Sequence, residues 1–309
     1  MPDLAAYATH SPFTDPGPHA VLLKAVPPDP AALHAAACRT VVHYRAGAEQ
    51  LAPGQDADID LRWLADILGE AQERATGPLD AAREPAQQIA GCCRDHTLFA
   101  IGVLREHGIP ARSRVGFAGY FRPGFHHDHV VAEHWDGSRW VRFDAELDAA
   151  NPWFGFDSHD MATGLGAPFE TAAEVWLAHR RDGLDVSTYG VDPSLPELCG
   201  PEFVRGYVVT ELAHRQRDEL LLWDVWGDTL PETSTPAEEL DRLADEIAEL
   251  LVAADGGSAA AEAELEQRYA SDPRLRPGEQ VVTLSPTGRV GDADLVAKVN
   301  RWRAPDAQG

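Results

Sequence analysis

The stretch of residues 91–148 constrains the fold most, because it predicts a helix, a strand and a β-hairpin in immediate succession. After Cys93, apolar residues recur near helical spacing, and the predicted helix ends at Gly108 with Pro110 two residues beyond. The segment ARSRVGFAGYF then alternates as a strand does. HHDHVVAEHW and WVRFDAEL are two further strands around an Asp-Gly turn at residues 136–137. We therefore expect a helix next to an antiparallel sheet.

Helical segments flank this stretch on both sides. Their apolar spacing predicts two helices before it and three after it, at residues 30–44, 58–75, 170–183, 201–227 and 235–257. Thr235 is expected to cap the last helix, with Glu238 completing a capping box. The order of helices, strands and helices predicts an α+β protein. We expect a core in residues 1–160 and a mainly helical part in residues 161–309, separate or packed into the same domain.

The chain is strongly acidic, with 50 Asp and Glu against 26 Lys and Arg and a formal net charge of -24. This charge repels polyanions, so neither nucleic acid nor an anionic membrane is expected as a partner. No run approaches the roughly 18 apolar residues of a membrane helix, and the opening has neither the basic leader nor the apolar core of a signal peptide. We expect a cytoplasmic protein, and the oligomeric state stays open.

The cysteines point to thiol chemistry rather than to disulfides. Four cysteines in 309 residues make no disulfide framework, and the adjacent pair Cys92 and Cys93 could bridge only with strain. A thiol reacts as the thiolate, which the positive end of a helix and a neighbouring imidazole both favour. Cys93 stands at the start of a predicted helix, so it has the first of these two aids.

The predicted hairpin supplies a histidine and a carboxylate on one face, whichever turn joins its strands. A two-residue turn sets His129 directly opposite Asp144. A four-residue turn pairs Trp135 with Trp140 and leaves the two diagonal. Either register keeps the imidazole and the carboxylate roughly 5 to 8 Å apart at Cβ. The sequence therefore predicts that His129 and Asp144 can act together.

Four motifs occur in a fixed order: Gly91-Cys92-Cys93-Arg94-Asp95, GIPAR at residues 108–112, His129 with Glu133, and Trp140 with Asp144. In this order they resemble the transglutaminase-like superfamily of papain-type thiol enzymes, over roughly residues 85–148. The opening SPFTDPGPH and the segment LLLWDVWG are also similar to a group of bacterial transglutaminase-like proteins. The chain departs from the family pattern in two places. Val131 stands where an aromatic residue is usual, and the extra Cys92 makes the choice of Cys93 depend on motif register.

The resemblance implies a papain/transglutaminase-like core and a Cys-His-Asp triad. Cys93 would be the nucleophile, His129 the general base and later acid, and Asp144 the group that orients the imidazole. The implied reaction is acyl transfer from an amide or ester of a peptide or small molecule through a thioester, to water or to an amine. No cofactor is implied. His127 shares the strand face of His129 and is the rival base.

Further residues are candidates for stabilising the oxyanion or for contacting the substrate. The backbone N–H of Cys93 is one expected oxyanion donor, and Gln87, six residues earlier, is the candidate for the second. Tyr120 and Phe121 belong to an aromatic-rich segment that forms either a substrate wall or ordinary loop packing. Asp95 is expected to cap the helix.

Two alternatives keep the fold without this chemistry. One is a binding protein that has lost turnover. The other is a metal site, because His127, His129 and Glu133 match the H-x-H-x-x-x-E spacing of cupin metal sites. A cupin needs a barrel of many strands, which the helical flanks do not supply. The alternative for Glu133 is an ion pair with Arg142, which the four-residue turn would set opposite it.

Overall fold

A computed structural model of the protein describes residues 4–151, 153–230 and 233–304. Its centre is a five-stranded sheet in the order β5-β4-β3-β6, with β7 paired to β4. All neighbours in this sheet are antiparallel except β7, which runs parallel to β4. The strands are β3 (Ala111–Arg122), β4 (Phe125–Trp135), β5 (Trp140–Phe143), β6 (Phe169–Thr171) and β7 (Tyr189–Gly190).

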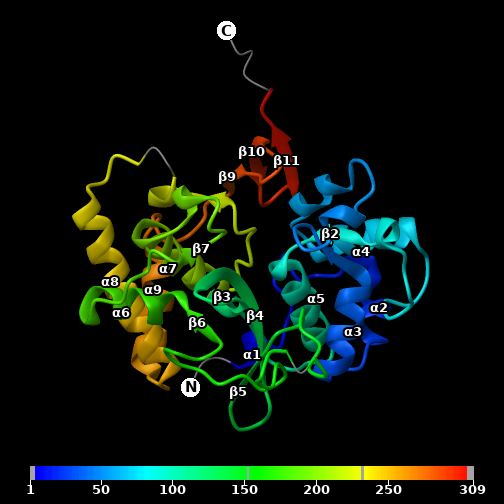
Figure 1. Ribbon diagram of the computed structural model, residues 1–309, viewed down its shortest axis with the longest axis horizontal. Coiled ribbons are helices and arrows are strands. Elements are labelled where there is room, and N and C mark those ends of the chain that lie inside the picture. The colour runs from blue at the N-terminus through cyan, green and yellow to red at the C-terminus, as the bar shows by residue number, and fades with distance from the viewer. Residues whose placement is uncertain (1–3, 152, 231–232, 305–309) are drawn as a thin grey trace.

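Helices cover both faces of this sheet, as Figure 1 shows, so the protein is α+β as the sequence predicts. On one side lie α2 (Ala20–Lys24), α3 (Pro30–Thr40), α4 (Leu64–Arg74) and α5 (Cys93–Glu106). On the other lie α6 (Ala172–Asp182), α7 (Pro201–Arg215), α8 (Ala237–Asp255) and α9 (Ala259–Ser271). A short helix, α1 (Leu4–Tyr7), precedes them. No described helix is long and apolar enough to cross a membrane.

Two smaller sheets complete the fold. The first is a parallel pair of β1 (Val41–His43) and β2 (Ile89–Gly91). The second has the order β11-β10-β9-β8 and lies at the upper end of the molecule in Figure 1. Its strands are β8 (Asp224–Val225), β9 (Gln280–Leu284), β10 (Val290–Asp294) and β11 (Val299–Trp302).

Residues from both expected parts of the chain share one core. A cluster of buried apolar side chains extends in sequence from Phe13 to Ala293 and includes members of α5, β3, α7 and α8. Polar contacts cross the same layers: Thr97 on α5 donates to the carbonyl of Val130 on β4 at 2.9 Å. On the other face, Arg114 of β3 pairs with Glu211 of α7 at 2.6 Å. The helices after residue 160 therefore pack directly on the sheet that carries the hairpin.

Helix α5 and the hairpin occur where the sequence predicts them, and the register decides between the two possible turns. Trp135 pairs with Trp140 and Glu133 with Arg142, so the four-residue turn is the one formed. Glu133 also forms the predicted ion pair with Arg142, at 2.8 Å, and a second one with Arg112 at 2.7 Å.

Other sequence predictions were wrong at element boundaries. The helix predicted for residues 30–44 ends at Thr40, because the following β-branched pair enters β1 and bonds with β2. The helix predicted for 58–75 begins only at Leu64, after a 3-10 turn over residues 55–60. The helix predicted for 201–227 ends at Arg215, and β8 follows at residues 224–225.

The start of α8 and the end of the chain also differ from the predictions. The predicted cap of Thr235 does not form, because its hydroxyl donates to Asp228 at 2.8 Å, and Pro236 occupies the cap position. Helix α9 and strands β9 to β11 were not predicted. Their apolar runs are short, so much of their stability must come from tertiary contacts.

Candidate active site

Cys93 is the first residue of α5, as predicted. The backbone N–H of Cys92 donates to the carboxylate of Asp95 at 2.8 Å, which confirms the capping role predicted for Asp95. Gly91 leaves room for this contact, because a Cβ there would lie 2.8 Å from an Asp95 oxygen and 2.8 Å from Val41. Strand β2 therefore turns into α5 with the two cysteines held at its N-terminus.

His129 and Asp144 meet across the hairpin. Nε2 of His129 lies 2.7 Å from Oδ2 of Asp144. Both residues are buried, with 2% and 1% of their surface exposed. Gly116 lies opposite His129 in the sheet, where a Cβ would approach the carbonyl of Glu170 to 2.1 Å. Because Nε2 is bonded to the carboxylate, Nδ1 is the ring nitrogen left to exchange a proton with another group.

The Asp144 carboxylate is held by three donors. Tyr120 donates its hydroxyl to Oδ2 at 2.6 Å, in addition to the His129 ring. The backbone N–H of Glu146 donates to Oδ1 at 2.8 Å. These contacts fix the plane of the carboxylate, and with it the orientation of the imidazole.

The pKa values of His129 and Asp144 are shifted in opposite directions, and both shifts favour the charged form of the residue. Burial is the largest single influence and disfavours the imidazolium, but Asp144, with Glu146 and Asp128, raises the pKa of His129 above 6.5. Burial also opposes ionisation of Asp144, but His129 and the hydroxyl of Tyr120 lower its pKa. His129 can therefore accept a proton readily while Asp144 stays ionised.

The Cys93 thiol behaves differently from the expectation of a ready thiolate. Hydrogen bonding with Cys92 raises its pKa well above 9.0, and burial and the acids Asp128 and Glu146 act in the same direction. The helix N-terminus acts in the opposite direction. These surroundings therefore favour the neutral thiol of Cys93 over the thiolate.

Cys93 and His129 line the same cavity, which has a volume of about 830 Å³. Part of its lining comes from the elements that carry these two residues and from the end of β1. Another part comes from residues within 191–229 and 284–286, which lie far away in the sequence. The part of the chain after residue 160 therefore shapes the space in front of the candidate nucleophile.

The structure places the other candidates at different distances from this cavity. Phe121 lines it, and its ring centre lies 5.1 Å from that of His129. Tyr120 lies behind Asp144 and positions the acid instead of forming a substrate wall. The rival base His127 lines the cavity, but its Nδ1 contacts the carbonyl of Val191 at 3.0 Å. Gln87 is not brought to the lining, because its side-chain oxygen accepts from the backbone of Glu84 at 3.0 Å.

The residues whose side chains could together bind a metal differ from the set that the sequence suggests. Glu133 is occupied by its ion pairs with Arg112 and Arg142 and does not join His127 and His129. Among the described residues, one atom each of His129, Asp144 and Glu146 lie within 4.8 Å of one another. Sequence reasoning missed Glu146, although its place two residues after Asp144, in the turn that leaves β5, was a usable signal.

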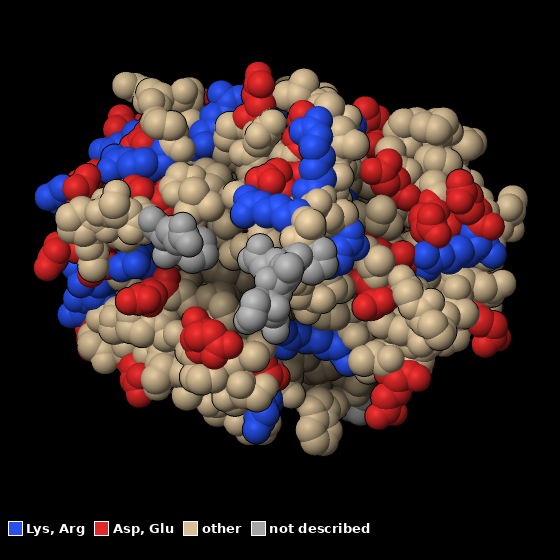
Figure 2. All heavy atoms as spheres, turned by 90° about the horizontal axis from the view of Figure 1, so that it is seen from above, with Lys and Arg blue, Asp and Glu red and all other residues tan. Residues whose placement is uncertain are grey.

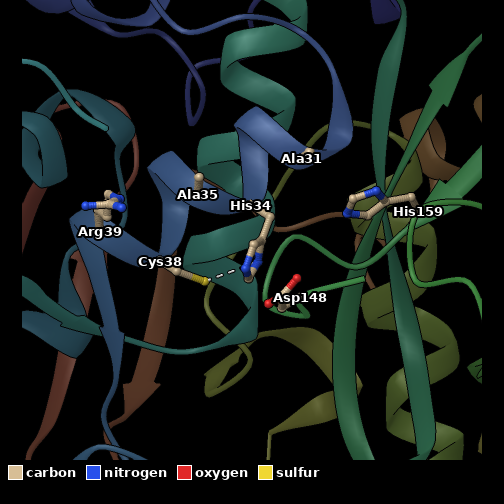
Figure 3. Close-up of a pocket in the computed structure, with 7 residues that line it drawn as sticks. All are labelled: Ala31, His34, Ala35, Cys38, Arg39, Asp148 and His159. Atoms are coloured by element: carbon tan, nitrogen blue, oxygen red, sulfur yellow. Dashed lines mark hydrogen bonds between the residues drawn. The ribbon is translucent and has the colours of Figure 1, made fainter. Parts of the chain in front are cut away.

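A second thiol and imidazole lie outside this cavity. Sγ of Cys38 is 3.5 Å from Nδ1 of His34, one turn earlier on α3, and both line an open pocket of about 450 Å³. Figure 3 shows the two side chains pointing toward each other, with Asp148 beside His34 and His159 across the pocket. Burial opposes ionisation of Cys38, but hydrogen bonds with His34 and His96 lower its pKa to about 7.

Part of the chain is similar to a known family. Residues 62–145 match the family model of the transglutaminase-like superfamily. No curated protein was found to match the chain. A crystal structure of a candidate cysteine protease from Cytophaga hutchinsonii shares 18% identity over 47% of this chain and 43% of that one, with a TM-score of 0.29.

The matched segment runs from just before α4 to just after β5, and so contains Cys93, His129 and Asp144. Lining residues at 43–46, at 146, within 191–229 and at 284–286 lie outside it. Much of the cavity lining therefore comes from parts of the chain that the family model does not match.

Proposed function

We propose that this protein is a cysteine-dependent acyl-transfer enzyme. The observation that supports this most directly is the buried hydrogen bond between His129 and Asp144 beside the cavity that Cys93 also lines. The transglutaminase-like match supports the same class, because members of that superfamily are generally cysteine-dependent enzymes.

In the proposed reaction, Nδ1 of His129 takes the proton of the Cys93 thiol as the sulfur attacks the carbonyl carbon of an amide or ester. The tetrahedral intermediate collapses to a thioester, and the imidazolium gives its proton to the leaving amine or alcohol. Water or an amine then attacks the thioester, with His129 again as base, and the thiol is regenerated. The ionised Asp144 stabilises the imidazolium at each stage.

The neutral thiol has a consequence for this mechanism. A preformed ion pair is not favoured, so deprotonation of Cys93 by His129 accompanies substrate binding or attack. The base must be neutral, and its pKa is raised. Activity should therefore be lost as the pH falls through the His129 pKa, at a value above 6.5.

Site-resolved mass spectrometry of iodoacetamide labelling tests the proposal, in a Cys38→Ser background that removes the competing thiol. Cys93 labelling at neutral pH should fall by more than about tenfold in His129→Ala. His159→Ala, a histidine of the other pocket, is the matched control and should leave it unchanged. Labelling of Cys93 that is unaffected by His129→Ala contradicts the proposed base.

Mass spectrometry of the reaction products, with and without added amine, then distinguishes hydrolysis from acyl transfer to an amine.

The raised pKa of Cys93 also favours the second candidate, a binding protein with this fold and no turnover. Such a protein would bind ligands in the cavity and form no thioester. Slow and similar labelling of Cys93 with and without His129 would support it.

A further inference from the structure

We propose that the cavity accepts acyl substrates that carry an ammonium or guanidinium group. This inference rests on the proposed function for its chemistry, and on the charges of the cavity wall for its specificity. The cationic group would lie among carboxylates, within reach of the sulfur that attacks the acyl carbon.

Four acidic residues line the cavity and come from two parts of the chain. Asp128 and Glu146 belong to the part that carries the candidate catalytic residues, and Asp192 and Glu202 belong to the part after residue 160. Arg45 is the one Lys or Arg among the described lining residues. The wall therefore attracts cations and repels anions.

These four acids have no basic partner within ion-pair distance among the residues that the structure describes. A fifth lining acid, Asp224, is different, because Arg62 binds it at 2.7 Å. Oε2 of Glu146 is buried and has no hydrogen-bond partner. A carboxylate oxygen in that state has lost its water without gaining a donor, and a ligand ammonium would supply one.

Glu146 is close to the reacting groups. One of its carboxylate oxygens lies within 4.8 Å of ligand atoms on both His129 and Asp144. A cation bound to Glu146 would therefore lie next to the acyl group under attack. Burial raises the pKa of Asp128, whose carboxylate accepts the hydroxyl of Tyr207 at 2.6 Å, so Asp128 contributes less charge than the other three.

Aromatic side chains add a second type of recognition for cations. Tyr44, Phe203, Tyr207 and Trp223 all line the cavity. Aromatic faces attract ammonium and guanidinium groups, and the attraction grows as water is excluded. An apolar substrate would also pack on these rings, but it would leave the carboxylates without partners.

A bound cation would also assist the chemistry. Asp128 and Glu146 are among the groups that raise the pKa of the Cys93 thiol. A positive charge placed between them and the sulfur would offset that effect and favour the thiolate. The substrate itself would then help to activate the nucleophile.

Three methanethiosulfonate reagents, one cationic, one neutral and one anionic, measure the charge preference of the cavity directly. Each forms a mixed disulfide with a cysteine, and the three differ little in size. We expect the trimethylammonium reagent to modify Cys93 at least about tenfold faster than the sulfonate reagent, relative to a cysteine peptide, with the neutral reagent in between. The ratio cancels the thiolate fraction, so it does not depend on whether His129 is the base. Cys38 in the same protein reports the effect of the overall charge of -24.

Variants identify the acids responsible. Glu146→Gln and Glu202→Gln, one from each part of the chain that lines the cavity, should each lower the cation preference at Cys93. Glu266→Gln removes an exposed acid that does not line the cavity and should leave it unchanged. Should Cys93 react with none of the reagents, a reporter on the wall, Leu195→Cys, reads the same ratio.

A cation preference no larger than at Cys38, or one that both Gln variants leave intact, overturns the inference. The proposed function is unaffected by that outcome, because its own test is the dependence of Cys93 labelling on His129. Conversely, a strong cation preference with no dependence on His129 would support a cation-binding cavity and contradict the enzyme.

Discussion

The thiol pKa values of Cys93 and Cys38 are shifted in directions opposite to those that their sequence surroundings suggest. Cys93 stands in a motif, at a helix N-terminus and beside a buried His129–Asp144 pair, yet its thiol pKa is raised. Cys38 stands in the last part of a helix, in no motif, and its pKa is lowered to about 7. Resting acidity and position for catalysis are thus separate properties here.

The physical reason is the charge around each sulfur. Cys93 is 5% exposed, hydrogen-bonded to the Cys92 thiol and near the carboxylates of Asp128 and Glu146, all of which disfavour the anion. Cys38 has an imidazole 3.5 Å away and lines an open pocket, so its anion is better stabilised. Of these two cysteines, Cys93 is the one that shares a cavity with a histidine hydrogen-bonded to a buried acid.

The largest expected effect is that of removing each sulfur in turn. Cys93→Ala should abolish acyl transfer, by about 10⁴-fold or more, because no other group replaces the nucleophile. Cys38→Ala, the matched control, should retain activity within about threefold. Steady-state kinetics on an activated ester measures both. Activity that survives in Cys93→Ala and disappears in Cys38→Ala would reverse the comparison.

A smaller effect is expected from Asp144→Asn. The amide cannot stabilise the imidazolium, so kcat/KM should fall by about 10² to 10⁴-fold. The Asp144 carboxylate contributes most among the acids that raise the pKa of His129, so the acidic limb of the pH profile should move to lower pH in the variant. A limb that stays in place would show that Asp144 does not act on the group that titrates. A pH series of kcat/KM on wild type and variant provides the measurement.

The smallest effect concerns Cys38. Its rate of alkylation should rise with pH around a midpoint near 7, because the thiolate is the reactive form. His34→Ala removes one of the two stabilising imidazoles and should move the midpoint upward. A rise of about one pKa unit cuts the thiolate present at pH 7 roughly fivefold. His19→Ala, on a distant 3-10 turn, serves as control, and an unchanged midpoint in His34→Ala would assign the low pKa to His96 instead.

Charged side chains of both signs are mixed on the surface. Figure 2 shows acidic and basic side chains intermixed over one face of the molecule. The acidic excess of the chain is instead partly directed inward, toward the cavity.

The sequence alone determined the part of the fold and site that depends on local order. The helix that begins at Cys93, the strand after GIPAR and the parity of the hairpin follow from periodicity and turn residues, so the meeting of His129 with Asp144 was predictable. Local pattern could not place β9 to β11, because strands of four or five residues carry too little periodic signal.

Only the tertiary structure decided the rest. It joined Tyr120 to Asp144 and brought residues within 191–229 and 284–286 to the cavity that Cys93 lines. It also set the direction of each thiol pKa. The reason is that burial and electrostatic interactions depend on which groups are neighbours in space, and those neighbours come from segments that are distant in the chain.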